Sequence, residues 1–324
     1  MIDGQPLLTV TDLSVCFPTD GGTVRALDSV SLKVDAGETL ALVGESGSGK
    51  SVTALSILRL VPDPGRIEKG SIVFEGQDLL GLDRRGIRAI RGNRIAMIFQ
   101  EPMSSLNPVL TIGKQVAEPI RLHRGLSWKK ALDEASELLA RVAIPDAASR
   151  LDSYPHQFSG GMRQRVMIAM ALACRPDLII ADEPTTALDV TVQAQILALL
   201  KDLTREANSA LILITHDLGV VARYADRVAV MYGGRIVETA PSRDLYANPR
   251  HPYTRGLMES IPRLDDESDK RLVPIDGQPP DLAHLPPGCA FSERCRHVVD
   301  RCRAELPLLE PLEESHSVAC FGHD

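Results

Sequence analysis

The eight residues from Gly44 to Ser51, with the sequence GESGSGKS, constrain the fold more than any other segment of the chain. They match the pattern G-x-x-x-x-G-K-[ST] and directly follow the apolar run 39–43, which has the composition of a buried strand. Apolar residues recur at helical spacing over 51–60, so a helix is expected after the loop. A strand, a glycine-rich loop and a helix in this order predict a phosphate-binding loop in an α/β fold.

The residue types in this loop suit the binding of a triphosphate. Glycines let the backbone curl so that its N–H groups point at phosphate oxygens, and the dipole of the following helix favours the anion. The Lys50 ammonium is expected to reach the β- and γ-phosphates, and the Ser51 hydroxyl to ligate Mg²⁺. The predicted nucleotide-binding residues are Gly44, Glu45, Ser46, Gly47, Ser48, Gly49, Lys50 and Ser51.

Composition narrows the class of protein. A chain of 324 residues with 44% hydrophobic content can form one large α/β domain and a smaller appendage. Its net charge of −7 argues against a nucleic-acid-binding protein, and we expect the short basic run 84–91 to be a solvated helix face. The chain has no apolar run long enough to span a membrane, and residues 1–6 lack the features of a signal peptide. We therefore expect it in the cytoplasm, with any membrane role exerted through a partner.

The order of the predicted elements indicates how the chain is organised. The N-terminal third contains short strands, including a pair at 70–74 and 94–99, that predict a β-rich edge beside a nucleotide-binding sheet. From about 111 to 175 strand patterns disappear, and 129–142 is typical of an amphipathic helix, so this part is a helical insertion. Buried strands then alternate with helices, which predicts a parallel sheet with right-handed crossovers. These strands are predicted at 178–182, 210–215 and 227–231, and the helices at 192–207 and 218–224.

An acidic pair at the end of a predicted strand supplies the chemistry that a phosphate loop lacks. Asp182 ends the apolar strand, where its carboxylate can hold Mg²⁺. The adjacent Glu183 can polarise a water molecule for in-line attack on the γ-phosphate. The pair therefore predicts hydrolysis of a nucleoside triphosphate rather than binding alone.

A short glycine motif gives the chain a specific resemblance. The segment 158–165, FSGGMRQR, resembles the signature motif of ATP-binding cassette (ABC) proteins. Three further landmarks are similar to those of this family: Gln100 resembles its Q-loop, 187–189 its D-loop, and His216 its switch histidine. Six motifs in the family's order over about 200 residues make coincidence improbable.

The resemblance implies a fold and a division into domains. The expected fold class is α/β, a P-loop NTPase of the ABC type, with a parallel RecA-like sheet, an antiparallel β subdomain and an inserted helical subdomain. The ABC domain is expected over 1–245, with the helical subdomain at about 103–175. Residues 246–324, rich in proline and cysteine, are expected to form a small, loop-rich C-terminal extension.

The resemblance also implies roles for individual residues, with ATP and Mg²⁺ as the ligands. Glu183 is the expected general base, His216 senses the γ-phosphate, and Gln100 contacts Mg²⁺ and water. Phe17 lies where the family places an aromatic ring against adenine, although a phenylalanine at a strand end can equally belong to the core. In the family two cassettes face each other, so that the signature of one caps the nucleotide of the other. The matching residues are Ser159, Gly160, Gly161 and Met162 of the signature and Asp189 of the D-loop.

Two features are similar to one branch of the family, the ATPases of dipeptide, oligopeptide and nickel importers. Phe158 and Met162 match that branch, and 247–257 resembles the segment that follows its cassette. The implied function is ATP-driven uptake of peptides, by a peripheral subunit at the cytoplasmic face of the cell membrane. The implied partners are a second ATPase subunit, two permeases and an extracytoplasmic peptide-binding protein, with the permeases contacting 101–108. A nickel or other solute importer, an exporter cassette and a soluble ABC ATPase remain as alternatives.

Four cysteines near the C-terminus suggest a metal centre. In a reducing cytoplasm clustered thiols favour a metal over disulfides, and the absence of C-x₂-C pairs disfavours zinc. The resembling dipeptide-importer subunits carry an iron–sulfur cluster in this region, so a structural [4Fe-4S] cluster is expected, with zinc or unligated thiols as alternatives. The four residues are Cys289, Cys295, Cys302 and Cys320.

Overall fold

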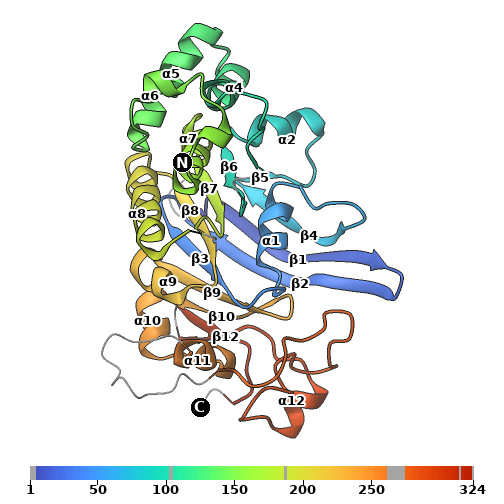
Figure 1. Ribbon diagram of the computed structural model, residues 1–324. Helices are drawn as coiled ribbons and strands as arrows, with labels where there is room; N and C mark the ends of the chain where they lie inside the picture. The colour runs from blue at the N-terminus through green and yellow to red at the C-terminus, as the bar shows by residue number, and fades with distance from the viewer. Residues whose placement is uncertain (1–4, 102–104, 186–187, 261–273, 314, 323–324) are drawn as a thin grey trace. The chain divides into compact units, whose positions relative to one another are not determined.

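The computed structural model describes residues 5–101, 105–185, 188–260, 274–313 and 315–322 (Figure 1). The chain forms two compact units. Unit 1 consists of 1–34, 39–80 and 214–324, and unit 2 of 35–38 and 81–213. Parts of two predicted motifs, 102–104 in the permease-contact segment and Ala187 in the D-loop, lie outside the described residues. None of the described helices is both long and apolar enough to cross a membrane.

Unit 1 begins with an antiparallel sheet in the strand order β2-β1-β4-β5. Two long strands, β1 and β2, replace the shorter strands expected from the sequence, because their buried residues continue through bulges. The strands are β1 (Leu8–Thr19), β2 (Gly22–Val34), β4 (Arg66–Phe74) and β5 (Gln77–Asp78). This sheet agrees with the antiparallel β subdomain predicted from the sequence.

Five further strands of unit 1 lie in the order β11-β12-β10-β9-β3. β3 pairs with β9 in parallel, and the remaining neighbours pair antiparallel. Every residue of β3 is buried, as the apolar run predicted. The strands are β3 (Thr39–Val43), β9 (Arg227–Tyr232), β10 (Arg235–Pro241), β11 (Glu310–Glu313) and β12 (His316–Val318). The helices of unit 1 are α1 (Lys50–Ile57), α9 (Leu218–Tyr224), α10 (Ser242–Ala247), α11 (Pro252–Glu259) and α12 (Asp300–Ala304).

Unit 2 contains three strands in the order β8-β7-β6 and most of the described helices. β6 pairs in parallel with β7, so the expectation that 94–99 forms a strand pair with 70–74 is wrong. Three of the four residues of β6 are buried, as expected for a strand of a parallel sheet that is covered on both faces. The strands are β6 (Ile95–Ile98), β7 (Leu178–Asp182) and β8 (Ala210–Thr215), at whose end the chain passes into unit 1.

The helices of unit 2 lie largely where the sequence predicted them. Between Ile112 and Leu172 the described residues form helices and no strand, and α4, α5 and α7 pack on one another. The basic run forms α2, as expected for a solvated helix face. The helices are α2 (Arg84–Ile90), α4 (Ile112–Arg124), α5 (Trp128–Arg141), α6 (Ala147–Arg150), α7 (Gly160–Leu172) and α8 (Val190–Glu206), with a short 3₁₀ turn at Pro155–Gln157.

The C-terminal residues of unit 1 are more ordered than a loop-rich tail. Tyr232, Tyr253 and Phe291 are buried together, with ring centroids 4.5 to 5.5 Å apart. The fully buried Glu238 carboxylate on β10 accepts hydrogen bonds from the backbone N–H groups of 250 and 251 and contacts His316 Nε2 at 2.7 Å. An aromatic cluster and a buried, fully bonded carboxylate thus tie this extension to β10.

The buried imidazole of His251 makes the stability of the chain sensitive to acid. Burial lowers the pKa of His251 from 6.5 to about 3, while its Nδ1 accepts a hydrogen bond from the N–H of Tyr253. The unfolded chain therefore binds a proton below pH 6.5 that the folded chain does not bind until about pH 3, so stability falls as the pH falls through this window. We expect His251 to lower the free energy of unfolding by about 2 kcal/mol at pH 5 relative to pH 7.

This expectation is checked by denaturant titrations of the wild type and of His251→Asn from pH 7 to pH 5. The loss of unfolding free energy should be smaller in the variant by about 2 kcal/mol. The exposed His297, changed to Asn, is the matched control and should retain the wild-type pH dependence. Equal pH dependence in His251→Asn and the wild type would contradict the expectation.

Candidate functional site

The phosphate loop of unit 1 joins β3 to α1, as the sequence predicted. Gly44 and Gly49 adopt positive φ values of 151° and 105°, and a Cβ atom at either position would collide with neighbouring atoms. At Gly44 the obstacle is the backbone carbonyl of Met231 on β9, so β9 sets the path of the loop. The Lys50 ammonium is buried and donates hydrogen bonds to the carbonyls of Gly44 and Glu45, at 2.8 and 2.9 Å. The lysine is therefore fixed at the N-terminus of α1, where an anion is favoured.

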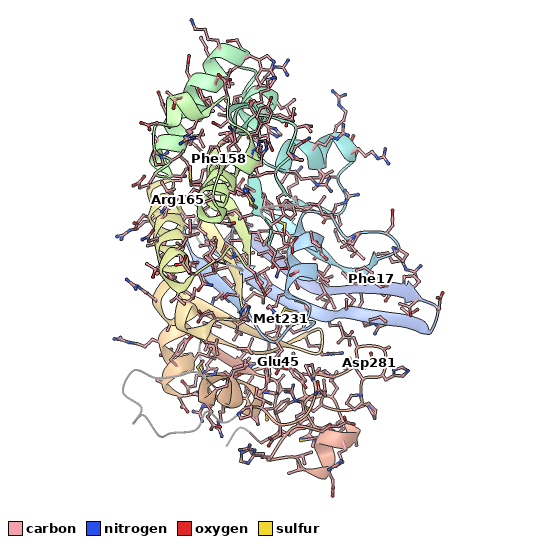
Figure 2. All side chains as sticks on the ribbon, viewed as in Figure 1. Phe17, Glu45, Phe158, Arg165, Met231 and Asp281 are labelled. Carbon is pink, nitrogen blue, oxygen red and sulfur yellow. The ribbon has the colours of Figure 1, made fainter. Side chains whose placement is uncertain are left out.

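Phe17, the predicted adenine contact, lies on β1 and is half-buried (Figure 2). Its ring packs on Gly65, where an added Cβ would come within 2.7 Å of the Phe17 Cζ atom. The ring thus has a fixed neighbour in unit 1, and part of it remains accessible.

Unit 2 brings together two of the predicted catalytic residues. Gln100, two residues after β6, donates a hydrogen bond from Nε2 to Oε2 of Glu183 at 3.0 Å. Asp182 is buried at the end of β7. Glu183 follows with a positive φ of 45°, a conformation that costs energy in a residue with a side chain and is found disproportionately at functional sites. The strand ends therefore present an amide and two carboxylates, which are suitable groups for Mg²⁺ and for an attacking water.

The predicted signature residues form the start of α7 in unit 2. The Ser159 hydroxyl caps the helix by accepting a hydrogen bond from the N–H of Met162 at 3.3 Å. Gly160 and Gly161 are in the first turn, and a Cβ at Gly161 would lie only 3.0 Å from Val192 of α8. The helix start is thus glycine-rich, and Ser159 and Gly160 are exposed, which suits an anion.

The remaining cassette residues have separate local roles. Asp189 caps α8 by accepting a hydrogen bond from the N–H of Val192 at 2.9 Å. His216 follows β8 directly and is exposed, beside Asp217, which caps α9. The position after the strand agrees with the sequence prediction, while its role in sensing phosphate stays a prediction.

The four C-terminal cysteines line one small cavity of unit 1. No disulfide links the six cysteines, all of which lie among the described residues. Burial raises the pKa of Cys289 to about 11 and also raises the pKa values of Cys295 and Cys320, so these thiols are protonated at neutral pH. Among the described residues, no group of three or more His, Cys, Asp or Glu side chains has an arrangement that could hold a metal ion. The expected iron–sulfur cluster is therefore not supported by this arrangement.

Comparison with known proteins relates these features to a family. Residues 27–186 match a family described as "ABC transporter", and 237–302 match "Oligopeptide/dipeptide transporter, C-terminal region". The chain is 51% identical to the dipeptide transport ATP-binding protein DppD of Bacillus subtilis, with 99% of this chain and 96% of that protein covered. It is also 51% identical to the oligopeptide transport ATP-binding protein OppD of Salmonella typhimurium, covering 97% and 93%. The chain belongs to the ABC transporter family. It is an ATPase of the branch whose members carry this C-terminal region.

Two similar solved structures support the assignment of this chain to the ABC transporter family. The dimeric post-hydrolysis state of the ATP-binding cassette MJ0796, bound to ADP and phosphate, has a TM-score of 0.66 and 29% identity, and covers 73% of this chain and 99% of that chain. The cassette cbiO1 of Clostridium perfringens has a TM-score of 0.63 and 27% identity, covering 75% and 91%. The predicted ABC fold class is confirmed.

Two residues that contact the phosphate loop were not identified in the sequence. Tyr253 and Arg294 of the extension both bind Glu45. They lie 208 and 249 residues away along the chain, and neither belongs to a nucleotide-binding motif. No local pattern could have identified them.

Proposed function

We propose that this chain is the ATP-hydrolysing subunit of an ABC importer for peptides, acting at the cytoplasmic face of the cell membrane. The observation that carries the hydrolytic part is the hydrogen bond between Gln100 and Glu183 beside the buried Asp182. The match of 237–302 to the oligopeptide/dipeptide transporter region supports peptides as the cargo. We also propose that the chain divides into an ABC domain at 1–245, with a helical subdomain at about 103–175, and an extension at 246–324.

The residues have distinct roles in the proposed reaction. Residues 44–51 cradle the phosphates, with Lys50 neutralising the β- and γ-phosphates. Ser51, Gln100 and Asp182 hold Mg²⁺, and Glu183 takes a proton from the attacking water. Phe17 contacts adenine and His216 contacts the γ-phosphate. The chemistry needs no covalent intermediate, so catalysis rests on positioning and charge.

A second cassette completes the proposed assembly. The start of α7, with Ser159, Gly160, Gly161 and Met162, binds the γ-phosphate of the nucleotide held by the other chain, and Asp189 of the D-loop lies at the same interface. The exposed glycine-rich helix start supports this role, because its N–H groups suit an anion supplied from outside the chain. Solved cassettes similar to this chain are described as dimeric. The partner is a related ATPase, which makes a heterodimer.

An apolar groove on unit 2 suits the proposed contact with a permease. Its lining is mainly apolar, with Met97, Phe99, Leu122, Met167 and Met170, while Glu118, His123 and Ser105 of the segment 101–108 also line it. Phe99 is 40% exposed and Leu122 65% exposed, so two large apolar side chains of one groove face the solvent together. We assign the groove to a cytoplasmic helix of a membrane-spanning partner, since methionine-rich grooves accept apolar helix faces.

A structural [4Fe-4S] cluster is a separate hypothesis, and no group of three or more His, Cys, Asp or Glu among the described residues is arranged to hold a metal ion. The observation in its favour is that the four cysteines line one cavity. Iron and acid-labile sulfide are measured in protein purified without oxygen. About four of each per chain would support the hypothesis; their absence would leave a cluster of unligated thiols and exclude it.

The proposed function is tested by purifying the chain from its own membranes in mild detergent and identifying its partners by mass spectrometry. Two polytopic permeases and a second cassette ATPase are the expected partners. The groove variant Phe99→Glu should lose the permeases, because it puts a charge into an apolar contact. Recovery with ribosomes or DNA, and without permeases, would contradict the proposal.

A further inference from the structure

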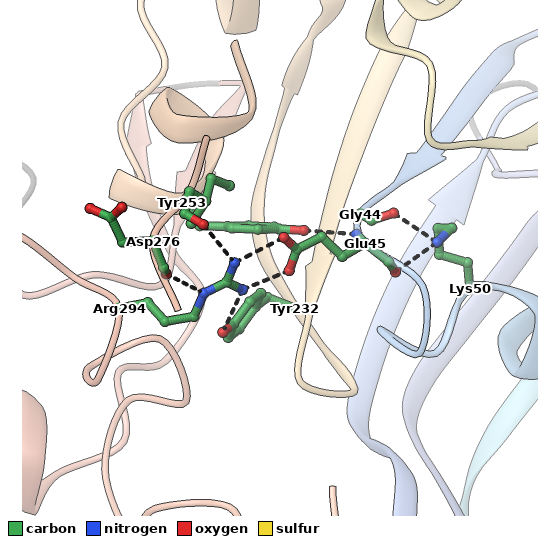
Figure 3. Close-up of polar contacts among 8 residues, drawn as sticks. Gly44, Glu45, Lys50, Tyr232, Tyr253, Asp276 and Arg294 are labelled. Carbon is green, nitrogen blue, oxygen red and sulfur yellow. Dashed lines mark hydrogen bonds and ion pairs between the residues drawn. The ribbon is translucent and has the colours of Figure 1, made fainter. Parts of the chain in front are cut away.

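The C-terminal extension binds the phosphate loop through an ion pair within unit 1 (Figure 3). Arg294 forms a two-pronged contact with Glu45, with Nη1 2.7 Å from Oε2 and Nη2 3.0 Å from Oε1. The side chain of Arg294 is only 6% exposed and that of Glu45 is 26% exposed. An ion pair with this geometry and burial is stronger than an exposed surface pair.

A second residue of the extension holds the backbone of the same loop residue. The N–H of Glu45 donates a hydrogen bond to the phenol oxygen of Tyr253 at 2.8 Å. Burial raises the pKa of Tyr253, so the phenol stays protonated and neutral. Glu45 is therefore fixed at two points by residues from two separate segments of the extension.

Arg294 is itself held in place before it reaches Glu45. Its Nε donates to the carbonyl of Asp276 at 2.9 Å, and Nη1 donates to the Tyr232 hydroxyl at 3.2 Å. Its guanidinium also lies over the rings of Tyr232 and Phe291, at 5.8 and 5.9 Å from their centroids. Hydrogen bonding to Glu45 raises the pKa of Arg294, so the guanidinium is charged at every physiological pH. The cation is thus rigidly positioned rather than a flexible surface charge.

The position of Glu45 gives this contact a consequence for nucleotide binding. The carbonyl of Glu45 accepts a hydrogen bond from Lys50, while its carboxylate points the other way, toward Arg294 (Figure 3). A carboxylate without a counter-charge in a loop that binds a triphosphate would repel the ligand. We propose that Arg294 is a positioning residue for ATP, which neutralises Glu45 and keeps its carboxylate turned away from the phosphate-binding side of the loop. This proposal rests on the proposed assignment of 44–51 as the ATP-binding loop.

Repulsion by an unpaired Glu45 carboxylate predicts a specific pattern of ATP affinities among variants. Arg294→Gln should raise the Kd and KM for ATP by about tenfold, with kcat changed by less than about twofold, because the repulsion acts on binding. The double variant Glu45→Gln with Arg294→Gln should restore the Kd to within about threefold of the wild type. Glu45→Gln alone should bind ATP at least as tightly as the wild type, since it removes a negative charge. The other contacts of the Arg294 guanidinium are left in place.

The experiment measures ATP binding and steady-state hydrolysis by the assembled transporter complex carrying each variant. Arg296→Gln is the matched control, because Arg296 forms an exposed ion pair with Asp276 in the same segment and should leave the Kd unchanged. If the double variant binds ATP as weakly as Arg294→Gln, or if Glu45→Gln alone weakens binding, the positioning role is wrong. Lys50→Ala separates this failure from that of the proposed site: unchanged ATP binding in that variant would instead overturn the assignment of 44–51.

Discussion

Replacing Glu183 by Gln should lower ATP turnover by at least about 100-fold while ATP affinity stays within about twofold of the wild type. The amide has the same shape and can still accept the hydrogen bond that Gln100 donates at 3.0 Å, so the local structure is preserved. It cannot accept a proton from water, so the attacking nucleophile is no longer activated. The change therefore separates binding from chemistry, and it is measured by ATP binding and hydrolysis in the assembled complex.

The control for this variant makes the same chemical change elsewhere in unit 2. Glu137 is exposed on α5, and Glu137→Gln should leave both ATP affinity and turnover unchanged. Turnover at the wild-type rate in Glu183→Gln would remove Glu183 from the mechanism. Loss of ATP binding in the same variant would indicate that the carboxylate contributes to the binding of MgATP rather than to proton transfer.

Lys50→Ala should weaken ATP binding by about 100-fold, which corresponds to about 2.7 kcal/mol. The buried ammonium is held by the carbonyls of Gly44 and Glu45 at the start of α1, the position from which it neutralises the β- and γ-phosphates. Alanine removes the charge and also leaves two carbonyls without this donor. Titration of the complex with a fluorescent ATP analogue measures the loss of affinity.

Thermal unfolding without nucleotide shows whether the Lys50→Ala protein is still folded. It therefore separates an effect on folding from an effect on ATP binding. The exposed Lys69 of β4, changed to Ala, provides the charge-matched control in unit 1 and should bind ATP as the wild type does. ATP affinity within about threefold of the wild type in a folded Lys50→Ala protein would contradict the role of Lys50.

The sequence was sufficient to predict the structure wherever a structural requirement produces a local pattern of residues. A glycine-rich loop between a buried strand and a helix needs Gly44 and Gly49 at positive φ, so the motif specified both the ligand class and the local backbone. The strands at 178–182 and 210–215 were predicted with their observed bounds, because strands buried on both faces are continuous apolar runs.

The sequence was insufficient where the structure depends on distant pairing. The strand at 94–99 was expected with 70–74 in a β-rich edge, whereas β6 pairs with β7, because the pattern of one strand does not identify its partner. The extension was expected to be loop-rich, yet it supplies β12 beside β10, and its short helices are stabilised by Tyr232, Tyr253 and Phe291. The spacing of the cysteines predicted that they gather but could not establish a metal-binding arrangement.

The most direct test of peptide import is to reconstitute the purified complex in proteoliposomes with its peptide-binding protein. The measured quantity is the ATP-driven movement of labelled dipeptides and oligopeptides across the membrane. With the wild-type chain, we predict transport that requires both ATP and the binding protein, and with Glu183→Gln no transport above the ATP-free background. Equal peptide movement with the two chains, or ATP hydrolysis by the wild-type complex without movement of any peptide, would contradict the proposed function.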